Sequence, residues 1–254
     1  MDFNFSVFSF LLLFLTGLVA GFVDSIAGGG GLISLPVLLS LGIPPQIALG
    51  TNKLQSSCGT LAAAANFIRR GTVDLNQCLH GIVFTFMGAV LGAWTIQQID
   101  AGFIRHIIPV MLLFVFFYTL FSKDLGTRSG HAKMDKNLFF TLFGLGLGFY
   151  DGFFGPGTGS FWTGSLLIFM GMDMTRAAGT TRIMNFTSNV VALSVFIIGG
   201  NVLYSAGICM AAGQVIGARA GSGLAIKKGA SFIRPVFLTM VFLTIVRLMY
   251  VNYV

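Results

Sequence analysis

The chain has 254 residues, of which 55% are hydrophobic and 9% charged, with a mean hydropathy of +0.88 and a formal net charge of +7. This composition excludes an ordinary soluble domain, whose surface carries about 25 to 35% charged residues. Many of the basic residues lie between apolar segments without forming a basic stripe, and the three cysteines have no CxxC spacing. We therefore expect no nucleic-acid partner, no disulfide framework and no metal or other cofactor.

Apolar segments follow one another along the whole chain. They cover residues 5–26, 31–41, 47–68, 77–97, 103–122, 138–154, 158–171, 175–198, 203–224 and 232–253. Most reach about 20 residues without polar alternation, which predicts membrane-spanning helices and not barrel strands. The second segment and the seventh are too short for a core about 30 Å thick, so we predict short or re-entrant helices there. No Lys or Arg precedes the first segment, which we expect to remain in the mature protein.

The sequence also repeats itself. GFVD at 21–24 and the glycine run at 28–31 return 127 positions later as GFYD and GPGT, and ALGTNK at 48–53 returns 129 positions later as AAGTTR. We predict an all-α integral membrane protein of two homologous halves, each with about four spanning helices and one short glycine-broken segment. The predicted parts are a first repeat at 1–122, a basic linker at 123–136 and a second repeat at 137–254.

The distribution of charge predicts an orientation. Arg69 with Arg70, the linker at 123–136, and Lys227 with Lys228 each follow an apolar segment, and the positive-inside rule places all of them in the cytoplasm. The protein would then cross the membrane several times with both termini outside. This requires each short segment to fold back on the preceding helix, which makes the halves inverted repeats. Four spans per half would make the halves parallel instead; we favour the inverted topology.

Two glycine runs mark the breaks in the helices. Irregular backbone at membrane depth is tolerated where it is buried in protein or lines a wet cavity. Each new helix start also presents free N–H groups and a positive dipole end, which suit an anion. The candidate binding positions here are Gly29, Gly30, Gly157 and Thr158. The alternative is that the glycines only permit tight turns and close packing.

Lys53 and Arg182 occupy equivalent positions of the repeat and are cations inside apolar segments. A charge in a spanning helix costs about 2.5 to 3.5 kcal/mol on insertion scales, so it usually faces a cavity or a partner. Polar side chains surround both cations in the sequence. We predict an oxyanion site that adds Asn52, Gln55, Thr180, Thr181 and Asn185. The alternative is that both cations snorkel to the membrane interface.

Asp24 and Asp151 are the acids deep in apolar segments, and they also match across the repeat. They can pair with Lys53 and Arg182, cap the broken helices, or carry a coupling proton. All three roles remain open from the sequence. The spacings Gly88-xxx-Gly92 and Gly213-xxx-Gly217 predict close helix packing.

The first-half motifs resemble the signature of the TauE/SafE sulfite exporter family. The resemblance rests on GFVDSIAGGGG at 21–31, the following Pro36 and ALGTNKLQ at 48–55, and it spans nearly the whole chain. It implies a secondary transporter of sulfur-containing anions, such as sulfite and sulfonates, in a bacterial-type membrane. It also implies that the glycine breaks and the Asn52–Lys53 and Thr181–Arg182 positions line the substrate path.

The second half departs from this signature. Pro156 replaces a glycine, Thr181 replaces Asn52 and Met184 replaces Gln55. We therefore expect a pseudo-symmetric site with more polar recognition on the first-half side.

The sequence and the resemblance together predict a secondary transporter that moves a small anion by alternating access between two repeats. An anion channel, or a transporter of a non-sulfur organic anion, is the alternative. We do not expect an enzyme, because no nucleophile with a base and no metal-ligand cluster stands out. The expected partners are a small anionic substrate and the lipid bilayer.

Overall fold

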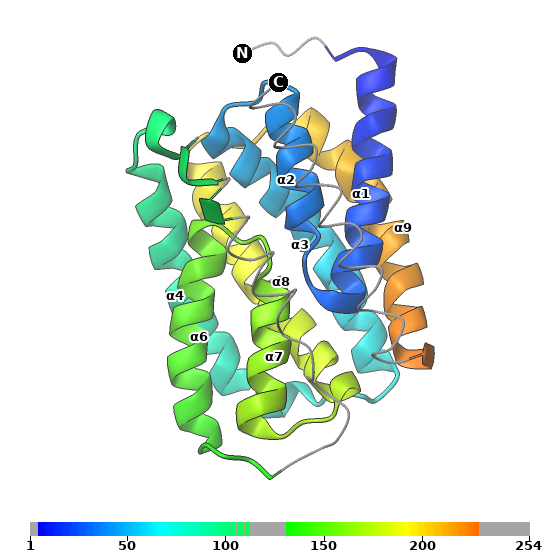
Figure 1. Ribbon diagram of the computed structural model, residues 1–254, viewed down its shortest axis with the longest axis vertical. Coiled ribbons are helices and arrows are strands. Elements are labelled where there is room, and N and C mark those ends of the chain that lie inside the picture. The colour runs from blue at the N-terminus through cyan, green and yellow to red at the C-terminus, as the bar shows by residue number, and fades with distance from the viewer. Residues whose placement is uncertain (1–4, 105, 109, 112–130, 229–254) are drawn as a thin grey trace.

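The computed structural model describes residues 5–104, 106–108, 110–111 and 131–228 (Figure 1). Most of the predicted segment 103–122, most of the linker and the whole predicted segment 232–253 lie outside the described residues, as does the C-terminus. The described part is built of helices, with no strand in it. The helices are α1 Val7–Ala27, α2 Gly31–Ser40, α3 Pro45–Arg69, the 3-10 turn η1 Leu75–Cys78, α4 Leu79–Gln97, α6 Lys136–Phe153, α7 Thr158–Met170, α8 Met174–Ile198 and α9 Tyr204–Lys228.

The helix ends follow local signals in the sequence. Ser6 caps α1 by accepting a hydrogen bond from the Ser9 N–H, and Asp135 and Asp173 cap α6 and α8 in the same way. Pro45 stands at the first position of α3, where its missing N–H costs nothing. Two predicted boundaries shift, because α6 begins inside the predicted linker at Lys136 and α9 continues to Lys228.

The surface of the bundle is apolar and its centre is polar. Val7 and Phe8 of α1 and Trp94 of α4 are among many large apolar side chains on the outside, whereas α3 and α8 bury hydroxyl, amide and charged groups. Within the described residues, Val7–Ile26, Leu75–Gln97 and Met174–Ile198 are long and apolar enough to cross a membrane. This arrangement is that of a helical membrane protein.

Two helix pairs pack through glycine at equivalent places in the halves. A Cβ on Gly213 or Gly217 of α9 would lie within 2.2 Å of a backbone oxygen of α1. A Cβ on Gly88 or Gly92 of α4 would come equally close to the backbone of α6. The predicted packing role of these glycines is therefore confirmed, and α1 stands against α9 as α6 stands against α4.

The short helices turn back beside the helices that precede them. In Figure 1, α1 runs down and α2 returns upward, whereas α6 runs up and α7 returns downward. Helices α3 and α8 cross the centre in opposite directions and bury most of their polar residues there. We call the lower end in this view, where α3 ends and α6 and α8 begin, the basic end, and the upper one the far end.

Candidate functional site

The two helix breaks touch each other at the centre of the bundle. Gly28, with φ +75°, ends α1, and a Cβ added to it would lie 2.4 Å from the Cα of Gly159 in the first turn of α7. The Ser160 hydroxyl donates to the Gly28 carbonyl at 2.7 Å. Glycine at both contact points is therefore needed for the halves to come this close.

A small polar cavity lies between the breaks. Its volume is about 20 Å³, which holds about one water molecule. Its walls come from both halves and include most of the predicted binding residues. They are Asp24, Gly29, Gly31, Asn52, Lys53, Ser56, Asp151, Gly155, Gly157, Thr158, Gly159, Asn185 and Asn189. An anion larger than water therefore requires these walls to separate.

The buried charges pair crosswise between the halves. Lys53 Nζ lies 2.7 Å from Asp151 Oδ1, and Arg182 Nη1 lies 3.6 Å from Asp24 Oδ2. The Lys53 and Arg182 side chains are 1% and 0% exposed, which rules out the alternative that they snorkel to an interface. Each cation thus meets the acid of the other repeat, which is one of the three roles that the sequence left open for the acids.

The two acids nevertheless differ in their other contacts. Asp24 Oδ1 accepts hydrogen bonds from the Gly29 and Gly30 N–H groups, both at 3.1 Å, and so caps the start of α2. Asp151 Oδ2 accepts from the Ser188 hydroxyl instead. The Lys53 ammonium also donates to Asn189 Oδ1 at 3.1 Å, which fixes this cation on both sides.

Arg182 keeps donors that no neighbour uses. Its Nη1 donates to the Asp24 carbonyl oxygen, but its Nε and Nη2 are buried without a hydrogen-bond partner within the described part of the chain. Arg182 does not itself line the cavity, but its Nη2 lies 3.3 Å from the point that a Cβ on Gly159, a lining residue, would occupy. Buried N–H groups of a guanidinium are costly to leave unsatisfied, so they mark a place for an acceptor.

The start of α7 also has unused donors. Its N-cap residue, Gly157, supplies no side-chain cap. Over the described residues, the N–H groups of Gly157 and Gly159 make no hydrogen bond. Both glycines line the cavity, so these donors lie near the unpartnered side of Arg182.

The polar groups of the first half mostly satisfy one another. Asn52 Oδ1 accepts from the Ser34 hydroxyl at 2.5 Å and from Gln55 Nε2 at 2.8 Å. Ser34, on α2, was not among the predicted site residues, although its hydroxyl one turn after a glycine break could have indicated such a role in the sequence. Gln55 is fully buried and its Oε1 has no partner in the described region.

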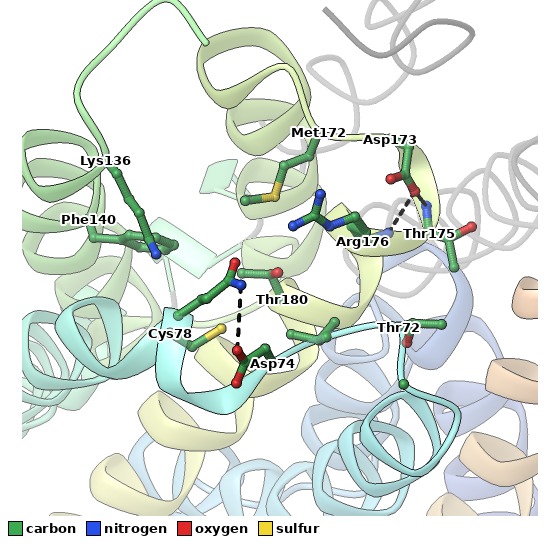
Figure 2. Close-up of a pocket in the computed structure, with 13 residues that line it drawn as sticks. Thr72, Asp74, Cys78, Lys136, Phe140, Met172, Asp173, Thr175, Arg176 and Thr180 are labelled. Carbon is green, nitrogen blue, oxygen red and sulfur yellow. Dashed lines mark hydrogen bonds between the residues drawn. The ribbon is translucent and has the colours of Figure 1, made fainter. Parts of the chain in front are cut away.

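Thr180 and Thr181 stand apart from the central cavity. The Thr181 hydroxyl lies 3.0 Å from that of Thr163 on α7. Thr180 lines a separate pocket of about 450 Å³ at the basic end, between η1, the start of α6 and the start of α8. Figure 2 shows Thr180 beside Cys78 in this pocket, with Lys136 and Arg176 entering from opposite sides.

At the far end, the position that matches Thr180 in the repeat is closed. Thr51 is the repeat equivalent of Thr180, is fully buried and accepts a hydrogen bond from the Leu203 N–H at 2.9 Å. A Cβ on the adjacent Gly50 would lie 2.0 Å from the Asn201 carbonyl oxygen. The connection between α8 and α9 therefore covers α3 tightly at the far end.

Comparison with known families agrees with this architecture. The sequence model of the family described as sulfite exporter TauE/SafE matches residues 13–248. The chain belongs to the TauE/SafE family. This confirms the resemblance seen in the motifs at 21–31 and 48–55, and it makes the chain a multi-pass membrane protein of a transporter family.

Relatives in the TauE/SafE family match over almost their full length. A "Probable membrane transporter protein" of Haemophilus influenzae is 40% identical over 239 residues, 94% of each chain. The "Probable membrane transporter protein YfcA" of Escherichia coli K12 is 39% identical over 94% of this chain and 89% of its own. "Probable membrane transporter protein ORF9" of a Sinorhizobium species is 39% identical over 98% of this chain and 94% of its own. No solved structure matches the chain.

Proposed function

We propose that this protein is a secondary transporter that binds a small oxyanion, of the sulfite or sulfonate class, between the two helix breaks. The observation that carries the proposal is that the buried Arg182 nitrogens Nε and Nη2 have no hydrogen-bond partner among the described residues, and that Nη2 lies close to Gly159 of the cavity wall. A planar guanidinium that offers two N–H groups matches a tetrahedral or pyramidal oxyanion. The sulfur chemistry comes from the family description.

The anion binds on the second-half side in this proposal. Arg182 and the N–H groups of Gly157 and Gly159 supply donors that no described residue uses, and the α7 start adds a partial positive charge of about +0.5. Lys53 plays the smaller part, because Asp151 and Asn189 already accept hydrogen bonds from two of the three N–H groups of its ammonium. It holds the α3 side of the cavity in place.

Transport then proceeds by alternating access between inverted repeats. The opposite directions of α1 and α6, and of α3 and α8, support the inverted topology (Figure 1). The open pocket at Thr180 and the covered Thr51 support unequal access from the two ends. The basic end faces the cytoplasm of a bacterial-type inner membrane and the N-terminus lies outside, because Arg69, Arg70, Lys227 and Lys228 follow the rule for inside loops.

A channel is the less favoured alternative. An open pore needs a continuous wet path, whereas the central cavity has only about 20 Å³ and the glycine backbones meet beside it. A site that must open around its ligand is typical of alternating access. The same geometry admits a carboxylate, so a non-sulfur organic anion is a second outcome of the binding test.

The test is a comparison of anion binding by the purified protein and by Arg182→Lys. Thermal stabilisation is measured with sulfite, sulfate, thiosulfate, methanesulfonate, sulfoacetate and matched carboxylates. Lysine keeps the charge beside Asp24 but loses the fork of N–H groups, so affinity should fall about 10- to 100-fold, the value of a charge-assisted hydrogen bond. Arg176→Lys, at the exposed rim of the basic end, is the matched control and should bind normally. Unchanged affinity in Arg182→Lys would reject this site.

A further inference from the structure

The central charges of the described bundle form a neutral set. Lys53 and Arg182 face Asp151 and Asp24 in two ion pairs, all within or beside one small cavity. The proposed transport adds an anion to this set. The α7 start offsets only part of the added charge, and the α2 start is already used by Asp24. An uncompensated charge at this depth is expensive, so a second charge change is needed.

Asp24 is the acid that can change its charge. Its Oδ2 makes no hydrogen bond within the described region and has Arg182 at 3.6 Å as its ion-pair partner. Its side chain is 13% exposed and lines the cavity, whereas that of Asp151 is 3% exposed. Both oxygens of Asp151 are engaged, by Lys53 and Ser188. An added anion beside Arg182 would therefore displace the looser ion pair and face Asp24 as a like charge.

The surroundings of Asp24 leave Arg182 as its charged partner. Helix α8 contributes Arg182, the start of α2 contributes two N–H groups, and α3 and α6 present Lys53 and Asp151 across the cavity. Helix α7 contributes the neutral Ser160 at Gly28, and α9 contributes the neutral Gln214 against Gly21. If Arg182 turns toward an anion, no other cation of the described residues forms an ion pair with Asp24.

We propose that Asp24 takes up one proton when the anion binds, and that anion and proton cross the membrane together. The proton comes from water on the side from which the anion enters. Asp24 Oδ2–H then donates to the anion, Arg182 compensates the anion, and the net charge of the site stays unchanged. Both are released on the other side, and no covalent bond to the substrate forms. This inference rests on the proposed anion site and makes transport of a monoanion electroneutral.

The first experiment measures proton uptake on binding of methanesulfonate, a strong-acid anion that carries no proton itself. A pH indicator in weakly buffered detergent solution should report about one proton per bound anion. The affinity should then rise about tenfold for each pH unit of acidification while Asp24 is ionised in the free protein, and level off at lower pH. Anion binding with no proton uptake would overturn the inference and leave the anion site intact.

The variant Asp24→Asn separates the proton from the anion. Its carboxamide oxygen can still cap Gly29 and Gly30, and it resembles a protonated carboxyl, so binding should persist with neither proton uptake nor pH dependence. Asp24→Ser, which keeps an acceptor, serves if the first variant does not fold. Asp173→Asn is the matched control, because Asp173 is an exposed cap with two backbone N–H groups at 3.0 Å, and its proton uptake should match the wild type.

Measurement of methanesulfonate flux into vesicles that contain the protein provides the second readout. Wild-type methanesulfonate flux should follow an imposed pH gradient and ignore a membrane potential, whereas Asp24→Asn should carry charge and respond to the potential. Proton uptake that persists in Asp24→Asn, or wild-type flux driven by the potential, would overturn the assignment. Absence of anion binding at every pH is a different result, because it rejects the anion site itself.

Discussion

The two helix breaks occupy equivalent places in the repeat, but their aspartates make different hydrogen bonds. At the first break, Asp24 caps the start of α2 through Gly29 and Gly30. At the second break, Asp151 leaves the start of α7 uncapped and bonds to Lys53 and Ser188. The aspartate of the first break thus bonds to backbone of that break, whereas the aspartate of the second bonds to side chains and leaves the Gly157 and Gly159 N–H groups without a hydrogen bond among the described residues.

Two residue differences explain this divergence. Pro156 stands where the first half has Gly29, and proline has no N–H for an aspartate to accept from. Ser188 stands where α3 has Gly59, and its hydroxyl gives Asp151 a partner that Asp24 lacks. The repeat therefore forms an asymmetric site, with a fixed ion pair, Lys53–Asp151, on one side and a longer one, Arg182–Asp24, on the other.

Breaking the ion pair between Lys53 and Asp151 should cause the largest loss of stability. Asp151→Ala leaves the Lys53 ammonium buried without its carboxylate, and breaking a buried pair costs about 3 to 5 kcal/mol. Asp24→Ala should cost less, because Asp24 is more exposed and its oxygen lies farther from Arg182. Chemical unfolding in detergent measures both variants.

A second variant identifies the cause of that loss. Lys53→Met combined with Asp151→Ala removes both charges and should recover much of the stability, because no lone charge remains buried. If the double variant is as unstable as Asp151→Ala, the ion pair does not explain the loss. Equal losses in Asp24→Ala and Asp151→Ala would contradict the contrast between the two acids.

Disturbing the contact between the two helix breaks should cause the next largest loss of stability. A Cβ in Gly159→Ala would lie 2.5 Å from the Gly28 Cα, so backbone must move and overpacking of this kind costs about 1 to 3 kcal/mol. Gly146→Ala is the matched control, because a Cβ there meets nothing within 4 Å. We expect Gly159→Ala to lower the melting temperature and the transport rate while Gly146→Ala changes neither. Normal transport by Gly159→Ala would show that the breaks need not touch.

Much of this fold could be predicted from local patterns. The lengths of the apolar segments predicted the described helices to within a few residues, and the glycine runs predicted the positions of the breaks. Both signals depend only on residues within one turn or one span. The partner of each charge could not be predicted. Lys53 and Arg182 match each other in the repeat, and so do Asp24 and Asp151, but the crosswise pairing depends on how the halves pack.

The hydrogen bonds of the predicted site residues could not be read from the sequence. More polar recognition was expected on the first-half side because of Asn52 and Gln55. In the structure Asn52 accepts hydrogen bonds from Gln55 and Ser34, and the Arg182 donors without a partner among the described residues lie in the second half. The residue type shows which hydrogen bonds a side chain can make, whereas the partners that it finds depend on residues far away in the sequence. That Asn52 and Gln55 bind substrate stays a prediction.

The two ends of the bundle offer the subtlest test. Thr51→Val removes the acceptor of the Leu203 N–H at the far end, which costs about 1 kcal/mol and should raise the population open at that end about fivefold. Thr180→Val changes the matching residue at the basic end, where a pocket of about 450 Å³ is already open. The probe is Val202→Cys, labelled by a water-soluble maleimide in a background without native cysteines. Thr51→Val should speed labelling and Thr180→Val should not. If both variants speed it equally, the bond between Thr51 and Leu203 does not hold the far end closed, and the difference between the ends lies elsewhere in the α8 to α9 connection.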